Sequence, residues 1–407
     1  MKKKILAYIF TGSFKNQQYI HNKLISSISK EFSKVIFIDL TFLILKINEN
    51  NKVLKKNFFL PRTYHQLDFF LSKYEVISFI ALGNDYEFFK VLRLLKKNNV
   101  KLILNKSIGL NKQNKVFKLA GRLEKKLQFF IFIFLVFINY LPKIDLVFEG
   151  SKENISRINK QLGRKIDKIL PFLNISYIKD IVHINCRAYD SYLDNLKEIS
   201  EKFIVFLDGG FDHPDVQLHE KKQSSENRKK YYHYLKKILN KLSKMYNKKI
   251  IFCVHPKVNE KKIKIFFKGE KIKLIKYKTQ NYILKAFMVV MHESSSTFDA
   301  LILKKRIINL NSILMGKYYY NRNKFYPQRV KIPSYKMENY KDINRLDIDK
   351  YFKNKDNLYD NYLKNFVKNI NSYKKIFFNK KIKSNYPKFD NLPGSIQIAK
   401  IIRKNFF

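Results

Sequence analysis

Residues 286–311, AFMVVMHESSSTFDALILKKRIINLN, decide the fold class of this chain. The apolar run 286–291 predicts a buried strand, residues 297–305 predict a short helix, and residues 306–311 predict a second strand. Two strands joined by a helical crossover in this way are typical of parallel pairing. The stretch therefore predicts an α/β domain.

The same alternation extends outward in both directions. In the second half, further strands are expected at 202–210, 249–257 and 272–277, with a helix from about 227 to 247. In the first half, helices are expected at 19–30 and 85–99 between strands at 3–11, 35–40, 76–84, 101–105 and 143–151. We therefore predict two Rossmann-like domains joined near residues 180–200, with 181–197 as a connector leading into a helix.

Size and composition agree with this reading. The chain has 407 residues, which exceeds one ordinary core, so two domains are expected. Hydrophobic residues make up 45% and aromatic residues 15%, which excludes a disordered protein.

The chain is strongly basic, with 82 Lys and Arg against 33 Asp and Glu and a net charge of +49. Such an excess attracts a nucleic acid, an acidic leaflet or a charged substrate. The lysines are spread along the chain among abundant Asn, Ile, Phe and Tyr, a bias typical of an AT-rich genome, and no RNA-binding aromatic signature accompanies them. We therefore expect no specific nucleic acid, and a basic binder of nucleic acid or acidic polymer is the non-enzymatic alternative.

Cys186 and Cys253 lack metal-ligand spacing and are expected as buried thiols in a reducing compartment. The first residues, MKKKILAYIFTGSF, have too short an apolar run for a signal peptide and are expected to form the first strand. Both features predict a cytoplasmic protein.

An uninterrupted apolar run, FFIFIFLVFI at 129–138, lies within the hydrophobic segment 128–141. It is shorter than the ~20 residues of a membrane-spanning helix. A buried core helix, an in-plane or re-entrant anchor and an abbreviated span are the three alternatives. Basic residues flank the run at 122, 125, 126 and 143. Because this pattern suits anionic headgroups, peripheral contact with an anionic inner-membrane surface is expected.

Three polar clusters follow predicted strands of the second half, where ligands bind in parallel sheets. The first is LDGGFDHPD at 207–215, in which Asp208, Asp212 or Asp215 could accept a proton from a hydroxyl. The second is VHPK at 254–257, in which His255 and Lys257 suit a phosphate oxygen. The alternative is an ordinary polar turn for the first cluster and a histidine satisfied by nearby backbone for the second.

The third cluster is MHESSSTFDAL at 291–301, between a strand and a helix. Hydroxyl groups and the first amides of the helix are expected to form an anion cradle there. Local helix capping is the alternative. The residues assigned to the cradle are His292, Ser294, Ser295, Ser296 and Thr297.

The order of an Asp-Gly strand end, a His-Pro pair and a Ser-rich turn resembles bacterial GT-B glycosyltransferases of surface polysaccharide assembly. Sialyltransferases and related nonulosonic-acid or Kdo-type transferases are most similar, over residues 200–310, and CDP-glycerol-type polymerases share the later two features. The resemblance implies that Asp208 is the general base and that His255 contacts the donor phosphate or assists departure of the nucleotide. It also implies that Ser294, Ser295 and Ser296 hold the phosphate. Leu207 stands where the family has an acidic residue, so Asp212 and Asp215 are alternative bases.

The resemblance also implies a GT-B architecture of two Rossmann-like domains facing a cleft. Residues 1–185 would bind the acceptor, 186–385 the nucleotide sugar, and 386–407 would form a C-terminal helix, N-capped by Ser395, that crosses back. The expected donor is a CMP-linked sialic-acid-like or Kdo-type sugar, and the expected acceptor is a glycan or glycolipid of lipopolysaccharide or capsule. No metal is expected, because no DxD pair or HExxH spacing stands out.

Overall fold

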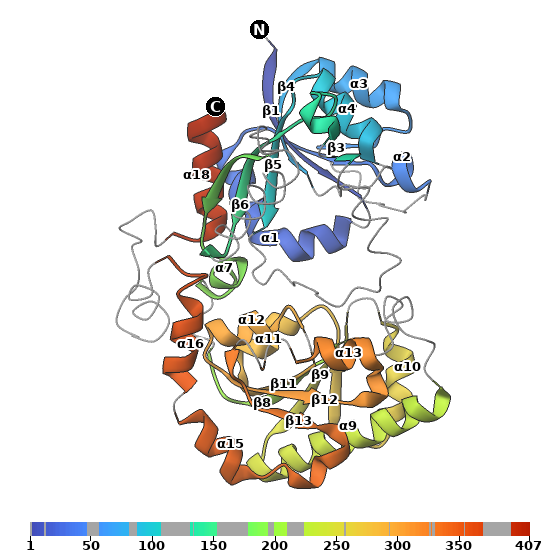
Figure 1. Cartoon of the computed structure of the whole chain (residues 1–407), viewed down its shortest axis with the longest axis vertical. Coiled ribbons are helices and arrows are strands. Elements are labelled where there is room, and N and C mark those ends of the chain that lie inside the picture. The colour runs from blue at the N-terminus through green and yellow to red at the C-terminus, as the bar shows by residue number, and fades with distance from the viewer. Residues whose placement is uncertain are drawn as a thin grey trace. The chain divides into compact units, whose positions relative to one another are not determined.

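A computed structural model shows two compact units (Figure 1). Unit 1 comprises Met1–Asp190, Asn365–Lys368 and Asn385–Phe407, and unit 2 comprises Ser191–Lys364 and Asn369–Ser384. The structure describes residues 2–11, 14–46, 57–80, 88–106, 131–132, 134–152, 178–193, 199–209, 224–255, 258–292, 294–324, 327, 330–353, 355–368 and 392–407.

Among these residues, unit 1 contains a sheet of seven parallel strands in the order β3-β2-β1-β4-β5-β6-β7. The strands are β1 (Lys3–Phe10), β2 (Val35–Asp39), β3 (Phe58–Phe59), β4 (Tyr74–Ile80), β5 (Lys101–Lys106), β6 (Ile144–Glu149) and β7 (Ile178–His183). The helices are α1 (Phe14–Glu31), α2 (Thr41–Leu45), α3 (Tyr64–Ser72) and α4 (Phe89–Lys97), and α7 (Arg187–Leu193) spans the boundary at which unit 2 begins.

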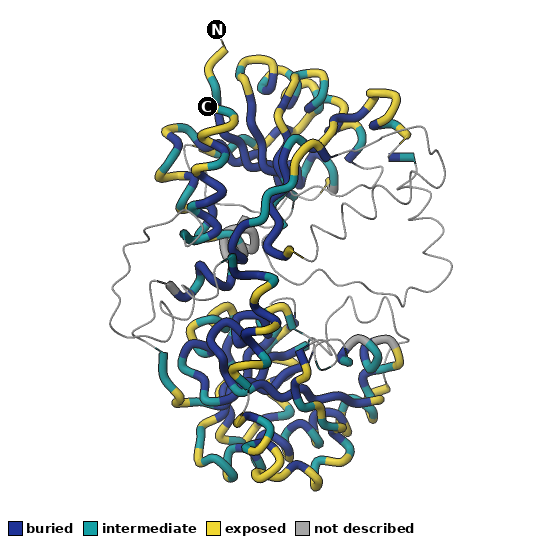
Figure 2. The backbone as a smooth tube through the Cα atoms, turned by 60° about the vertical axis from the view of Figure 1, so that its left-hand side comes forward, coloured by how far each residue is buried: buried dark blue, intermediate teal, exposed yellow. Residues whose placement is uncertain are grey.

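Strand β1 shows why this sheet has a core on each face. Alternate side chains of a strand point to opposite faces. Ile5, Ala7 and Ile9 join one buried cluster, whereas Leu6, Tyr8 and Phe10 join another. A strand buried on both faces needs an unbroken apolar run, as ILAYIF provides. The dark blue strand interior of each unit in Figure 2 shows this burial.

The expected connector at 181–197 was wrong at its start. Residues 181–183 complete strand β7, which pairs with β6 alone among the described strands, and helix α7 begins at Arg187. Most of the β7 residues are half-buried or exposed. An edge strand of this kind lacks the apolar run by which buried strands are recognised.

The predicted return of the last helix is confirmed. Helix α18 (Gly394–Phe406) belongs to unit 1, although the chain forms unit 2 before reaching it. Ile398, Ala399 and Ile402 of α18 share a buried cluster with Leu6 of β1 and Ile28 of α1.

The expected N-cap of this helix was wrong, because Ser395 lies inside α18. Asp190 caps the helix from elsewhere in the sequence: its Oδ1 accepts the Gly394 N–H at 2.6 Å and its Oδ2 the Ser395 N–H at 2.7 Å. Asn185 adds two bonds, from its N–H to Gln397 Oε1 at 3.1 Å and from its Nδ2 to the Leu392 carbonyl at 2.9 Å. A carboxylate at a helix N-terminus satisfies free amides and interacts favourably with the helix dipole.

We expect Gly394→Ala to lower the free energy of unfolding of unit 1 by more than about 3 kcal/mol. A Cβ at this position would lie 1.9 Å from the backbone oxygen of Asn185, so the helix must shift away. Urea denaturation followed by far-UV circular dichroism measures the loss. Gly269→Ala is the control, since a Cβ there meets nothing within 4 Å and only its positive φ of 84° adds strain, about 1 kcal/mol. Equal losses in the two variants would contradict this account of the α18 junction.

Unit 2 contains, among the described residues, a sheet of six parallel strands in the order β10-β9-β8-β11-β12-β13. The strands are β8 (Phe203–Leu207), β9 (Lys249–Cys253), β10 (Ile272–Ile275), β11 (Ala286–Met291), β12 (Arg306–Asn311) and β13 (Ser334–Lys336). The helices are α9 (Ser225–Tyr246), α10 (Glu260–Lys264), α11 (Thr279–Leu284), α12 (Thr297–Ile302), α13 (Lys317–Arg322), α15 (Arg345–Phe352) and α16 (Lys355–Leu363).

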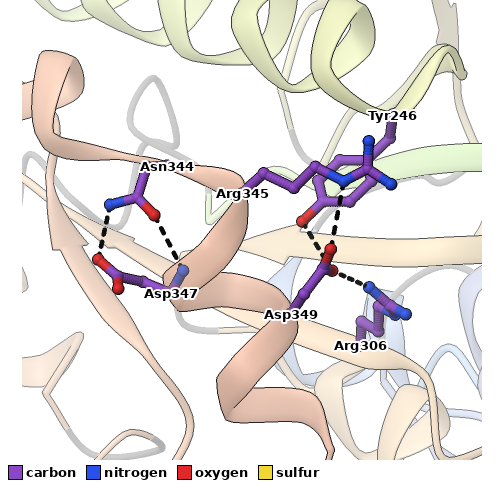
Figure 3. Close-up of polar contacts among 6 residues, drawn as sticks. All are labelled: Tyr246, Arg306, Asn344, Arg345, Asp347 and Asp349. Carbon is purple, nitrogen blue, oxygen red and sulfur yellow. Dashed lines mark hydrogen bonds and ion pairs between the residues drawn. The ribbon is translucent and has the colours of Figure 1, made fainter.

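The carboxylate of Asp349 links helix α15 to the sheet of unit 2 (Figure 3). Asp349 pairs with Arg306 at the start of β12 and with Arg345 at 3.2 Å, and it accepts the Tyr246 hydroxyl at 3.2 Å. The first turn of α15 is closed by Asn344, whose side-chain oxygen accepts the Asp347 N–H at 2.9 Å. These contacts hold helix α15 at the amino end of strand β12.

Both units consist of a parallel sheet with helices between the strands. The predicted α/β fold of two Rossmann-like domains is confirmed.

Candidate functional site

The three polar clusters predicted from the sequence follow strands that are neighbours in the sheet of unit 2. Asp208 follows β8, His255 lies two residues after β9, and His292 and the serines 294–296 come after β11. The sheet order is β9-β8-β11 and all pairings are parallel. The three clusters therefore share the carboxyl edge of one sheet, where ligands of such folds bind.

Asp208 connects the first two clusters. Its N–H donates to the Cys253 carbonyl at 3.1 Å, which extends the β8–β9 pairing by one bond. Its Oδ2 accepts the backbone N–H of His255 at 3.1 Å. The Asp208 side chain is buried, with 6% of the residue exposed, and His255 is half-buried. The Asp208 carboxylate therefore holds the backbone in place at His255, after the end of β9.

The third cluster is tied to the same edge through its backbone. The His292 N–H donates to the carbonyl of Leu207, the residue before Asp208, at 3.4 Å. The structure thus brings Asp208, His255 and the start of the serine turn together.

His292 lies inside unit 2, with 1% of the residue exposed. Its Nδ1 lies 2.8 Å from the Leu310 carbonyl, and its Nε2 lies 2.6 Å from the Tyr231 hydroxyl. A carbonyl oxygen only accepts, so Nδ1 carries the proton and Nε2 accepts from Tyr231. Burial lowers the pKa of His292 to about 4, and the bond to Leu310 offsets this only in part. The ring is therefore neutral at pH 7.

This placement differs from the expectation that His292 contacts a donor phosphate, because both ring nitrogens are hydrogen-bonded in the interior of unit 2. Tyr231, which sequence reasoning missed, is its partner from helix α9. The sequence around Tyr231 gives no sign of this contact, because Tyr231 and His292 are 61 residues apart and meet only in the folded unit.

We expect unit 2 to lose stability as the pH falls from about 6.5 to about 4. The folded pKa of His292 is about 4, below the ordinary value of 6.5, so the unfolded chain takes up the proton first. The loss attributable to this group reaches about 3 kcal/mol below pH 4. Urea midpoints at pH 7 and pH 4.5 measure it. His292→Phe should reduce the pH dependence, while His233→Gln, at an exposed position of α9, should leave it unchanged. An unchanged slope in His292→Phe would contradict the assignment.

The serine turn is held by its own hydrogen bonds. The N–H groups of Thr297 and Phe298 donate to the carbonyls of Ser294 and Ser295 at 3.2 and 3.3 Å. The Ser294 hydroxyl oxygen accepts the Ser296 N–H at 3.3 Å. The Ser296 side chain makes no cap bond to α12. The N–H groups of Ser296, Thr297 and Phe298 therefore donate within the turn itself. The serine hydroxyls are left as the candidate ligand groups.

Thr297 does not fit the expected cradle. It is completely buried, and its hydroxyl donates to Met291 Sδ at 2.7 Å. Ser295 is exposed, and Ser294 and Ser296 are half-buried. Spacing alone did not distinguish Thr297 from the serines, because all four precede or begin the same helix; burial of the first turn of α12 separates them.

Asp212, Asp215 and Lys257 lie outside the described residues. Within the described part of the chain, no group of three His, Cys, Asp or Glu residues is placed to hold a metal ion. Neither cysteine forms a disulfide, and both are buried. Burial raises the pKa of the Cys253 thiol to about 12, so this neighbour of the site is a neutral core residue rather than a nucleophile.

No protein-family model and no curated protein sequence matches the chain. Solved structures do match. The wall teichoic acid polymerase TagF is 15% identical in one structure, with a TM-score of 0.51 over 99% of this chain and 88% of that chain. A second TagF structure is 14% identical, with a TM-score of 0.50 over 99% and 89%. UDP-GlcNAc 2-epimerase from Neisseria meningitidis is 12% identical, with a TM-score of 0.47 over 98% of each chain. At this identity the TagF likeness shows the fold, which is the two-domain GT-B fold.

Proposed function

We propose that this chain is a glycosyltransferase that moves a sugar from a nucleotide donor to a glycan or glycolipid acceptor, with the donor bound at the carboxyl edge of unit 2. The observation that carries the proposal is the Asp208–His255 hydrogen bond across the ends of β8 and β9, beside the turn that follows β11. A carboxylate, an imidazole and hydroxyl groups at one sheet edge suit a sugar phosphate.

In the proposed reaction, Asp208 accepts the proton of the attacking acceptor hydroxyl. The acceptor oxygen forms the new glycosidic bond as the bond between the sugar and the donor phosphate breaks. The nucleotide leaves with the negative charge on its phosphate. His255 and the hydroxyls of Ser294, Ser295 and Ser296 stabilise this charge as it develops. Lys257, Asp212 and Asp215 keep their proposed roles as phosphate ligand and alternative bases, and no metal takes part.

The proposed donor is a CMP-linked sialic-acid-like or Kdo-type sugar, and the proposed acceptor belongs to lipopolysaccharide or capsule. The enzyme would work in the cytoplasm at the anionic inner-membrane surface. The likeness in fold to TagF favours a second candidate reaction, which is CDP-glycerol-type transfer of a polyol phosphate to a polymer.

A thermal-shift screen with CMP, CDP and UDP tests the proposal. A nucleotide at 100 times its Kd stabilises the folded protein by about 2.7 kcal/mol. We expect CMP to raise the Tm more than UDP does. In a turnover assay with the acceptor present, we expect the protein to consume a CMP-sugar rather than CDP-glycerol. Consumption of CDP-glycerol would instead select polyol-phosphate transfer. A non-catalytic basic binder would ignore all three nucleotides and would bind polyanions with a steep salt dependence.

A further inference from the structure

The described part of the hydrophobic segment, residues 131–132 and 134–141, carries apolar side chains on two opposite faces. Residues 131–132 and 134–137 are helical. Phe132 and Val136, four residues apart, are buried in the core of unit 1. Phe134, Phe137 and Ile138 lie on the opposite face and are 58%, 43% and 49% exposed. A helix apolar all round calls for a second apolar environment on its outer face.

Tyr140 continues the exposed face beyond the helix. We call Phe134, Phe137, Ile138 and Tyr140 the aromatic patch; each is at least 40% exposed. Clusters of exposed large apolar side chains mark interaction sites in proteins. Isolated ones, such as Ile265 in unit 2, need no such explanation.

Cations border the aromatic patch. The guanidinium of Arg93 lies 4.7 Å from the centroid of the Tyr140 ring, so helix α4 runs beside the patch. Phe89 of α4 also contacts Phe132, with ring centroids 6.2 Å apart. Arg93 is exposed, whereas Lys90 and Lys97 of the same helix contact α3, through the Tyr64 ring and the Asp68 carboxylate. Lys143, three residues after Tyr140, is exposed as well.

No helix among the described residues is long and apolar enough to cross a membrane. The segment 134–140 is instead built like an in-plane contact, with its inner face anchored in the core and its outer face carrying aromatic rings. Tyr and Phe rings at headgroup level with cations beside them are the usual composition of interfacial membrane contacts.

We propose that the aromatic patch, with Arg93 and Lys143 at its border, docks unit 1 onto an anionic lipid membrane. The inference deepens the membrane location included in the proposed function, and it does not depend on any catalytic role in unit 2. Charge selects the lipid over a second copy of the chain. A two-fold contact through this patch would bring the same cations together, between chains that each carry a net charge of +49.

Flotation of the full chain with vesicles tests the proposal. Wild-type protein should float with vesicles containing phosphatidylglycerol and remain below those of phosphatidylcholine alone. The triple variant Phe134→Ser, Phe137→Ser, Ile138→Ser should reduce the bound fraction by at least about tenfold. Its matched control is Ile265→Ser, Ile313→Ser, Leu346→Ser, which changes three exposed apolar residues of unit 2 and should bind as wild type.

The cations are tested separately, because these substitutions do not affect the core. Arg93→Gln with Lys143→Gln should weaken binding to anionic vesicles by about fivefold per charge removed. Lys271→Gln with Lys273→Gln removes the same charge from exposed positions of unit 2 and should have a smaller effect. Circular dichroism confirms that each variant is folded.

Three results would overturn the proposal: no binding of wild type to anionic vesicles, equal losses in the patch variants and their controls, or a self-associated wild type that the triple variant makes monomeric. Failure here is distinguishable from failure of the proposed function. If the protein floats with vesicles but no nucleotide stabilises it, the docking proposal stands and the transferase proposal fails. If CMP stabilises the protein but it does not float, the transferase proposal stands and the docking proposal fails.

Discussion

Replacing His255 with alanine is expected to lower the rate of sugar transfer by about 10²- to 10⁴-fold, the range for loss of one group that stabilises charge or transfers a proton. His255 lies two residues after the end of β9, and its backbone N–H donates to Asp208 Oδ2 at 3.1 Å. Alanine keeps that N–H. The loop should therefore stay in place while the imidazole is removed, so the effect reports on the side chain rather than on the fold.

The measurement is kcat with nucleotide sugar and acceptor, together with the Tm of each variant. His233→Ala is the matched control, because His233 lies exposed on helix α9 of the same unit. It should turn over as wild type does. Undiminished turnover in His255→Ala would remove His255 from the mechanism. A fall in Tm well beyond that of the control would indicate that the residue is structural.

The inner strands of both units could be predicted because their sequences are nearly continuous apolar runs, whereas the edge strands β3, β7 and β13 were missed. The run AFMVVM at β11 is buried along almost its whole length, as expected for a parallel strand covered on both faces. The order of the polar clusters then located the site edge, since the carboxyl ends of parallel strands lie together. Asp208 and His255, 47 residues apart, were expected at one edge for this reason, and the structure joins them by a hydrogen bond.

Tertiary partners could not be predicted. His292 and Thr297 stand among serines that suit a phosphate, yet Tyr231, Leu310 and Met291 engage their polar atoms inside unit 2. The cap of α18 was missed for the same reason, because the carboxylate that receives its amides is Asp190, 204 residues before Gly394. Local spacing identifies the residue types at a turn, but burial decides which of them are available to a ligand.

Asp208→Asn and Asp208→Ala are expected to lower transfer alike, by about 10²- to 10⁴-fold, while differing in stability. Asparagine keeps an oxygen that can accept the His255 N–H, now at 3.1 Å, but it cannot take a proton from the acceptor. Alanine removes both functions. Because the residue is buried, the lost hydrogen bond should cost about 1–3 kcal/mol of unfolding free energy in the alanine variant, against less than about 1 kcal/mol in the asparagine variant.

The pair of variants separates a base from a positioning residue. If Asp208→Asn transfers sugar at nearly the wild-type rate while Asp208→Ala is inactive, the carboxylate serves only to hold the loop after β9. The base must then be sought at Asp212 or Asp215, by the same Asp→Asn substitution at each. If both Asp208 variants are inactive and only the alanine variant is destabilised, the proton acceptor is also the residue that orders the His255 loop. The buried carboxylate of Asp208 would then have two roles: it would orient the loop that carries His255, and it would accept the proton of the acceptor hydroxyl. Both roles are compatible with its position at the carboxyl end of β8, beside the end of β9.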